Sequence, residues 1–254
     1  MPGPTGHVRH NRAVWDRVSP WYERRHARVL GGRFAMTWGI FRVPERKLRL
    51  LGPTRRKKIL ELGCGAARWS AALREGGARP VGLDLSSVQL ARARKLQQER
   101  GARFPLIRGS AERLPFRDAA FDLVFCDWGA MTFADPMGSV PECARVLRHG
   151  GTFVFSTASP FRYLTLDLDK DRQSRRLIRP YFADRRIRLG NDDAIEFQLP
   201  YGAWIDLFDR NGLALERLVE TRPTPGQRTT YLSGADAQWG RSWPLEAIWK
   251  LRKD

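Results

Sequence analysis

Apolar residues in the middle of the chain occur in short runs, separated by longer segments whose apolar positions recur at helical spacing. The runs predict strands at 59–62, 80–84, 104–108, 121–126 and 152–156, and the segments between them predict helices at 66–75, 88–100 and 137–147. Strands that alternate with helices indicate right-handed crossovers and a parallel sheet covered on both faces.

The chain before the first strand has a different pattern. Val14, Trp15, Val18, Trp21 and Tyr22 are spaced three and four residues apart and predict an amphipathic helix over 11–28, which Pro20 interrupts or restarts. Residues 1–10 are predicted to be disordered, and a short second helix is predicted over 44–51.

After the fifth strand the alternation stops over residues 157–200. This charged, partly helical segment is interpreted as an insertion over the carboxyl edge of the sheet, the edge where the parallel strands end. The pattern resumes with a helix at 201–211 and strands at 214–220 and 247–251. We therefore predict a basic helical lid over 1–52 and a main domain over 53–254, with 157–200 as a substrate cap.

Charge changes this picture because it is unevenly distributed. The net charge is +18; residues 1–58 hold 15 Lys and Arg against 3 Asp and Glu, and residues 159–188 hold 9 against 4. One interpretation is a solvated surface. The other is a positive rim that attracts an acidic substrate, a nucleic acid or an anionic membrane surface.

Cysteine usage and hydropathy indicate the compartment. Cys64, Cys126 and Cys143 share no metal-ligand spacing and fit free thiols in a reducing cytoplasm, and no metal is predicted. No window has the length and apolarity of a membrane span, and the basic first thirty residues do not resemble a secretory signal. We expect a cytoplasmic protein.

Candidate chemistry begins in the stretch ILELGCGAAR, residues 59–68. Gly63 and Gly65 lie in the predicted turn between the first strand and its helix. Glycine there permits positive φ and a close approach of the backbone to a bound group, at the positive end of the following helix. This arrangement is typical of a nucleotide-type pocket.

Three further positions indicate which nucleotide is bound. Asp84 ends the second strand, where a carboxylate can accept hydrogen bonds from both ribose hydroxyls. Arg68 replaces the third glycine of the dinucleotide fingerprint, and Glu61 would repel a pyrophosphate but attract an ammonium group. The residues therefore favour an adenosine with a positive, amino-acid-like tail, with Ser110, Ala111 and Glu112 near the adenine.

At this point the sequence resembles the class I S-adenosylmethionine-dependent methyltransferases, in particular the type 11 small-molecule group. The matching stretches are ILELGCGAAR, VGLDLS, GSAERLPF, FDLVFCD and ECARVLRHGGTFVFS, which occur in this order. The resemblance implies an α/β, doubly wound, Rossmann-like fold with a seven-stranded, mostly parallel sheet of order 3-2-1-4-5-7-6. Two departures are Ala67, where the family often has a third glycine, and Ser110, where it often has Asp.

The resemblance also implies the cofactor, S-adenosylmethionine, with S-adenosylhomocysteine as product. Glu61, Gly63 and Gly65 would contact its methionine part, Asp84 its ribose, and Ala111 with Glu112 its adenine. The full predicted cofactor-binding set is Trp15, Tyr22, Glu61, Gly63, Cys64, Gly65, Arg68, Asp84, Leu85, Ser110, Ala111, Glu112, Asp127 and Trp128.

Catalytic candidates are few, because methyl transfer from a sulfonium depends chiefly on orientation and exclusion of water. Asp127, which follows the fourth strand, is the first choice for a base or acceptor-orienting group, and its alternative role is a helix cap or turn former. His26 is the second choice. Cys64 is interpreted as a small contact residue rather than a nucleophile, and Trp15, Tyr22 and Trp128 as either core or cofactor contacts.

The leading hypothesis is methyl transfer to an O, N or C atom of a small molecule, acidic or aromatic, in specialised metabolism. Phe161, Tyr163, Tyr181 and Phe182 lie among arginines and could hold a flat acidic substrate, or residues 168–188 form a solvated surface helix. A less favoured alternative is an RNA methyltransferase, for which Trp21, Tyr22, Phe34, Trp38 and Phe41 would stack on bases. A nicotinamide oxidoreductase and a non-catalytic cofactor-binding protein are further alternatives.

Overall fold

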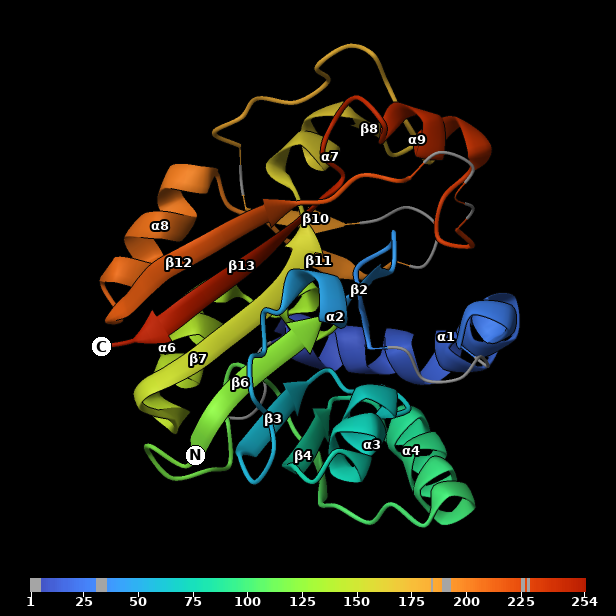
Figure 1. Ribbon diagram of the computed structural model, residues 1–254. Helices are drawn as coiled ribbons and strands as arrows, with labels where there is room; N and C mark the ends of the chain where they lie inside the picture. Colours follow the sequence, from blue (N-terminus) through green and yellow to red (C-terminus); the bar gives the residue numbers. More distant parts are fainter. Residues whose placement is uncertain (1–5, 31–35, 184, 189–192, 225–226, 228) are drawn as a thin grey trace.

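A seven-stranded sheet forms the centre of the molecule (Figure 1). The computed structural model describes residues 6–30, 36–183, 185–188, 193–224, 227 and 229–254. The strands run in the order β12 (Leu213–Glu220), β13 (Glu246–Lys253), β7 (Leu147–Ala158), β6 (Phe121–Asp127), β3 (Lys58–Leu62), β4 (Arg79–Asp84) and β5 (Leu106–Arg108). When these seven strands are numbered in chain order and the sheet is read from β5 to β12, the order is 3-2-1-4-5-7-6, as predicted.

Strand direction agrees with the sequence pattern. β7, β6, β3, β4 and β5 are parallel neighbours, and β13 pairs antiparallel with both β7 and β12. The helices that connect the parallel strands are α3 (Arg68–Glu75), α4 (Ser87–Arg100) and α6 (Pro136–Val146), and α8 (Tyr201–Asp209) precedes β12. Ser86 caps α4 by accepting a hydrogen bond from the Gln89 amide, and Gly101 ends the helix with φ of 63°.

Alternate side chains of the central strands pack into two cores, one on each face of the sheet. On one face, Leu60, Leu62 and Val124 pack against side chains of α6 and α8. On the other face, Ile59, Leu123 and Phe125 pack with Leu73 of α3 and with Trp38, Leu50 and Leu51 from the chain before β3. The segment before the sheet therefore contributes to the core as well as to the surface.

Helix α1 (Gly6–Leu30) crosses the end of the sheet toward which the arrowheads of β3 and β6 point (Figure 1). It begins earlier than predicted, so the prediction of disorder is wrong for Gly6–His10 and untested for residues 1–5, which lie outside the described ranges. The helix also continues through Pro20. Proline removes only one hydrogen bond of the ladder, and contacts on both sides of Pro20, Asp16 with Ser86 and Glu23 with Arg68, hold the helix on the rest of the molecule.

Short elements follow α1. β1 (Thr37–Trp38) and β2 (Val43–Pro44) form a hairpin, and α2 (Glu45–Leu48) is shorter than predicted. Within the described ranges, no helix is long and apolar enough to cross a membrane.

The segment after β7, which the sequence predicts to be an insertion, is mostly not helical. α7 (Pro160–Thr165) leads into β8 (Leu166–Asp167) and β9 (Arg172–Gln173), and β10 (Arg186–Arg188) pairs with β11 (Ile195–Phe197). The alternative of a surface helix over 168–188 is wrong for its described residues, which form turns and short strands. A further helix, α9 (Gly234–Trp239), lies in the connection between β12 and β13.

Candidate active site

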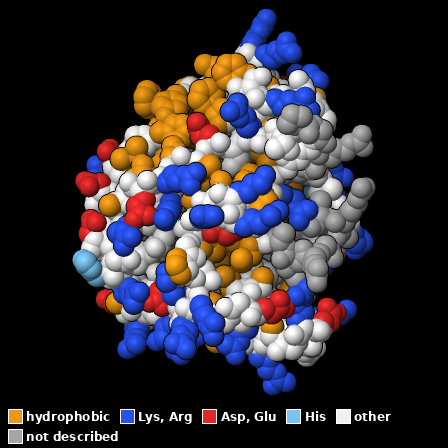
Figure 2. Space-filling model, in the orientation of Figure 1, with side chains coloured by type: hydrophobic (Ala, Val, Ile, Leu, Met, Phe, Trp, Pro, Cys, Tyr) orange, Lys and Arg blue, Asp and Glu red, His pale blue; other side chains and the backbone are white. Residues whose placement is uncertain are grey.

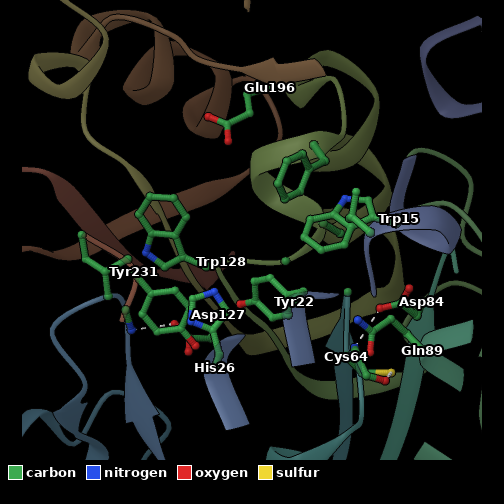
Figure 3. A pocket seen from close by; sticks show the side chains of 18 of the residues that line it. Trp15, Tyr22, His26, Cys64, Asp84, Gln89, Asp127, Trp128, Glu196 and Tyr231 are labelled. Atoms are coloured by element: carbon green, nitrogen blue, oxygen red, sulfur yellow. Dashed lines mark hydrogen bonds between the residues drawn. The ribbon is translucent and has the colours of Figure 1, made fainter. Parts of the chain in front are cut away.

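One cavity of about 1080 Å³ lies at the carboxyl edge of the sheet, between the ends of β3, β4 and β6, helix α1 and the insertion (Figure 3). It exceeds the range of about 300–1,000 Å³ that is typical of pockets for one small molecule. All the predicted cofactor-binding residues and both catalytic candidates line it: Trp15, Tyr22, His26, Glu61, Gly63, Cys64, Gly65, Arg68, Asp84, Leu85, Ser110, Ala111, Glu112, Asp127 and Trp128.

The turn after β3 explains why glycine stands at position 63. Gly63 has φ of 62°, and a Cβ there would lie 2.3 Å from the backbone nitrogen of Ala130. The close approach at this residue is thus to another part of the chain, the Gly129–Ala130 backbone. Gly65 has φ of 53° with more space around it, and Ala67 adopts φ of 54° at the start of α3.

Asp84 joins two of the loops that form the cavity. Its Oδ2 accepts a hydrogen bond from the Gly65 amide at 2.8 Å, and its Oδ1 accepts one from the Ser86 amide at 2.8 Å. Burial raises the pKa of Asp84 to about 6, although these hydrogen bonds lower it. The carboxylate is therefore held rigidly in the cavity wall.

Glu61 is the second buried acid of the cavity. Its Oε2 accepts a hydrogen bond from the Ser70 amide at 3.0 Å and another from the Ser70 hydroxyl. Burial raises its pKa to about 8, and the neighbouring carboxylates of Asp127 and Asp84 raise it further. A positive group bound beside Glu61 would reverse this effect.

Asp127 ends β6 and fixes the hairpin formed by β1 and β2. Its Oδ1 accepts hydrogen bonds from the Gly39 amide at 2.8 Å and from the Ser156 hydroxyl at 2.6 Å. Burial raises its pKa to about 6. Asp127 forms no side-chain cap on α5 (Ala130–Phe133), and its Oδ2 has no hydrogen bond to the described part of the chain.

A buried glutamate that sequence reasoning missed supports the same hairpin. Glu246 Oε2 accepts hydrogen bonds from the Ile40 amide and from Trp128 Nε1, each at 2.7 Å. These bonds orient the Trp128 indole and bring Gly39, Ile40 and Arg42 to the cavity. Glu246 was missed because it stands at the start of an apolar strand near the end of the sequence. Nothing in that pattern indicates that its side chain supports the cavity.

Helix α1 is attached to each of the loops that follow β3, β4 and β5. Its contacts are Glu23 with Arg68 at 3.3 Å, Asp16 Oδ1 with the Ser86 hydroxyl at 2.6 Å, and His7 Nε2 with Glu112 Oε1 at 2.7 Å. Arg92 of α4 also donates to the Ser19 carbonyl at 2.6 Å. Through these contacts α1 forms one wall of the cavity.

Aromatic rings gather where α1 meets the chain before α9. Tyr22 lies beside His26 with ring centroids 4.5 Å apart, and His26 stacks on Tyr231 at 4.3 Å (Figure 3). His26 Nδ1 lies 2.7 Å from the Thr230 hydroxyl, and burial together with Arg25 lowers the pKa of His26. Tyr231 and Thr230 were missed because they occur in a segment without regular periodicity.

The insertion supplies the wall opposite the glycine turn. The Arg162 guanidinium lies 5.6 Å above the Trp128 ring, and its buried Nε has no hydrogen-bond partner in the described part of the chain. Glu196 of β11 projects into the cavity and accepts a hydrogen bond from the Tyr163 hydroxyl (Figure 3). Sequence reasoning missed both residues.

The predicted aromatic cage of the insertion does not form. Phe161, Tyr163, Tyr181 and Phe182 are all absent from the described lining of the cavity. Tyr163 is buried, Phe161 stacks on Trp243, and Phe182 is 85% exposed. The prediction failed because the four rings lie on two separate elements: Phe161 and Tyr163 are in α7, whereas Tyr181 and Phe182 are in the turns after β9.

Other sequence-based expectations concern thiols, metals and stacked bases. Cys64 is buried, and burial raises the pKa of its thiol well above the usual value, so it is not an activated nucleophile. The described residues contain no cluster of His, Cys, Asp and Glu suited to a metal ion. Trp38 and Phe41, offered as base-stacking residues, are buried in the core, and Phe34 lies outside the described ranges.

Comparison with known proteins identifies the central part of the chain. Residues 60–155 match the Methyltransferase domain family. A demethylmenaquinone methyltransferase from Geobacillus kaustophilus is 31% identical over 152 residues, which are 58% of this chain and 62% of that protein. The matched part of the chain thus spans less than two thirds of the length of this curated relative.

Solved structures agree on the fold. An S-adenosylmethionine-dependent methyltransferase from Mesorhizobium loti superposes with a TM-score of 0.66 at 24% identity, covering 82% of this chain and 96% of that one. Geranyl diphosphate C-methyltransferase from Streptomyces coelicolor superposes with a TM-score of 0.69 at 14% identity, covering both chains completely.

Proposed function

Residues 60–155 belong to the class I S-adenosylmethionine-dependent methyltransferases, and from that premise we propose that the whole chain transfers a methyl group from S-adenosylmethionine to a small-molecule acceptor. The observation that carries this proposal is a set of three carboxylates that line one cavity: Glu61 and Asp84, which are buried, and Asp127, which is partly buried. Burial raises the pKa of each, so a cationic ligand is favoured there over an anionic one.

The residues present suit the cofactor. Gln89 Oε1 lines the cavity near Gly65 and is buried without a hydrogen-bond partner in the described residues, so it can accept a bond from a bound group. Asp84 and Leu85 would hold the ribose, and Glu61 with the Gly63–Gly65 turn would hold the charged amino-acid end. A dinucleotide pyrophosphate would face the carboxylates of Glu61 and Asp127, which argues against a nicotinamide oxidoreductase.

The remaining predicted cofactor residues would complete the enclosure. Ser110, Ala111 and Glu112 lie where the adenine is expected, and Cys64 and Arg68 flank the glycine turn. Trp15 and Tyr22 of α1 would cover the bound molecule and exclude water. Trp128 would separate the cofactor from the acceptor.

The acceptor would occupy the part of the cavity between Trp128, Tyr231 and the insertion. When bound, the cofactor supplies an activated methyl group on a sulfonium, so the protein's task is orientation. The Trp128 and Tyr231 rings would position a flat or apolar acceptor, and the Arg162 guanidinium would attract an acidic group on it. Asp127, with its unbonded Oδ2 and a pKa of about 6, suits removal of a proton from an acceptor hydroxyl near neutral pH.

The first test is binding of S-adenosylhomocysteine by calorimetry. We expect Asp84→Asn to weaken binding at least about tenfold, because hydrogen bonds to a charged group contribute about 1.5–3 kcal/mol. Asp118→Asn, on an exposed acid outside the cavity, is the matched control. Equal affinities of both variants and the wild type would overturn the assignment of Asp84.

The second test identifies the acceptor class. Purified protein is incubated with methyl-labelled S-adenosylmethionine and a host extract, and the label is partitioned among small molecules, RNA and protein. We expect label in the small-molecule fraction. Cofactor binding without transfer to any fraction would favour a non-catalytic role, and label in RNA would overturn the proposed acceptor class.

A further inference from the structure

The loop between β9 and β10 exposes apolar side chains that neither the sheet nor the cavity uses. Among the described residues, four of the ten exposed large apolar side chains lie within residues 177–182, namely Leu177, Ile178, Tyr181 and Phe182. Leu177 is 69% exposed and Phe182 is 85% exposed. Figure 2 shows hydrophobic side chains gathered at the top of this face of the molecule, where Figure 1 shows this loop. We call residues 172–183, which comprise β9 and the chain that follows it, the apolar loop.

The charge of the apolar loop is entirely positive. It contains Arg172, Arg175, Arg176 and Arg179 and no acid, and the nearest acids in sequence are Asp171 and Asp184. Arg175 and Arg176 are exposed, and neither side chain forms an ion pair within the described ranges. Lys and Arg side chains are visible around the hydrophobic group in Figure 2.

The apolar loop is fixed to the wall of the cavity. Ser174 donates from its amide to the Thr165 carbonyl at 2.7 Å, and Ile178 donates to the Leu164 carbonyl at 2.6 Å. The Arg179 guanidinium donates to the Tyr163 carbonyl at 2.8 Å. These bonds attach the loop to α7, whose Arg162 lines the cavity, so the exposed side chains are presented on a defined support.

We propose that the apolar loop docks the protein on the surface of an anionic lipid bilayer. Leu177, Ile178 and Phe182 would enter the boundary between headgroups and acyl chains, and Arg175 and Arg176 would contact the anionic headgroups. Stable attachment to a membrane surface needs two signals together, and this loop combines an apolar one with a basic one. The net charge of +18 adds a long-range attraction of the same sign.

An anionic lipid bilayer complements these residues better than a nucleic acid or a second copy of this chain would. A nucleic acid would use arginines and stacked aromatic rings, and it offers no partner for the exposed aliphatic side chains of Leu177 and Ile178. A second copy of this chain would carry the same uncompensated arginines, which repel one another. An anionic bilayer alone complements both the charge and the apolar side chains.

The test is flotation of the full chain with lipid vesicles, measured without acceptor or turnover, so its result is independent of the proposed methyl transfer. Vesicles of phosphatidylcholine alone are compared with vesicles that also contain phosphatidylglycerol, at about 0.05 M and about 0.5 M salt. We expect binding to the anionic vesicles at low salt. The variant Leu177→Ser/Phe182→Ser should bind at least about tenfold more weakly, and Arg175→Gln/Arg176→Gln about thirtyfold more weakly.

Matched controls remove the same number of apolar or charged side chains elsewhere. Met137→Ser/Ile205→Ser removes two exposed apolar side chains, and Arg117→Gln/Arg210→Gln lowers the net charge equally. Both should bind like the wild type, and unchanged thermal unfolding of all variants verifies their fold. Equal binding by every variant, or no binding to either vesicle, would overturn the proposal. A dimer in sedimentation that Leu177→Ser/Phe182→Ser abolishes would assign the loop to self-association instead.

Discussion

At the scale of single residues, the cavity is governed by carboxylates whose charge is disfavoured by burial. Glu61, Asp84 and Asp127 keep hydrogen bonds to backbone amides or hydroxyls, yet the pKa of each is raised. In the folded protein, the three carboxylates therefore lack a positive partner. A cationic ligand would supply one and lower their pKa values, so its binding is coupled to the release of protons from these carboxyl groups.

Glu61 allows a direct test of that coupling. Folding raises its pKa from the ordinary value of 4.5 to about 8, so its contribution to stability is complete below about pH 4.5 and is lost as the pH rises through about 8. We expect binding of S-adenosylhomocysteine at pH 7 to release protons, seen as a calorimetric enthalpy that depends on the buffer. Glu61→Gln should remove most of this dependence, and Glu99→Gln should keep it. An identical dependence in Glu61→Gln would contradict the assignment.

Asp127 allows a test of catalysis once an acceptor is identified. Asp127→Asn should lower kcat by about 100-fold or more, with little change in the affinity for S-adenosylhomocysteine. Ser156→Ala removes a hydrogen bond that lowers the pKa of Asp127, so the acidic limb of the kcat profile should move to higher pH. If Ser156→Ala leaves that limb unmoved, Asp127 is not the titrating base.

At the scale of elements, α1 forms one wall of the cavity and is attached to several neighbouring elements. It contacts the loops after three neighbouring strands through Glu23, Asp16 and His7. Asn11 also binds it to β11, because its amide donates to the Ile195 carbonyl at 2.8 Å and its oxygen accepts from the Ile195 amide at 2.8 Å. One helix thus contacts both the proposed cofactor side and the proposed acceptor side of the cavity.

Substitution of Asp16 tests whether the attachment of α1 limits release of the ligand. Asp16→Ala breaks the bonds to the Ser86 hydroxyl and, at 3.3 Å, to the Val88 amide, and these contribute about 1–2 kcal/mol together. We expect S-adenosylhomocysteine to dissociate about tenfold faster, measured by stopped-flow fluorescence. Asp118→Ala is the control, and equal dissociation rates would show that α1 does not limit release.

At the scale of the whole molecule, the chain before β3 is packed into the sheet domain. Trp38 is fully buried, donates from Nε1 to Glu45 at 2.6 Å and contacts the Trp69 ring at 4.9 Å. Leu50 and Leu51 are buried in the same core. The predicted boundary after residue 52 stays a prediction, and these contacts favour cooperative unfolding of both parts.

Trp38→Ala tests that cooperativity. Truncation of a buried tryptophan costs about 3–5 kcal/mol of the free energy of unfolding. We expect one denaturation transition at lower urea concentration, with the same midpoint by circular dichroism and by fluorescence. Two separate transitions would show that the first segment folds independently of the sheet, and Trp243→Ala, on a half-exposed ring, is the mild control.

The sequence by itself determined the sheet and the side of the cavity that we propose for the cofactor. Apolar runs alternating with helical segments specify parallel strands, and the carboxyl ends of such strands meet at one edge, so Glu61, Asp84 and Asp127 had to converge. The glycines and the capping Ser86 follow from local backbone geometry, which neighbouring residues dictate.

Only the tertiary structure decided the side that we propose for the acceptor. Tyr231, Glu196, Arg162 and Glu246 come from irregular segments or from the far end of the chain, and they meet through long-range contacts that no local periodicity encodes. The same reason explains the missed continuity of α1 through Pro20 and the failed aromatic cage. Those features depend on what each segment packs against, because a buried polar or aromatic side chain acquires its role from its partners.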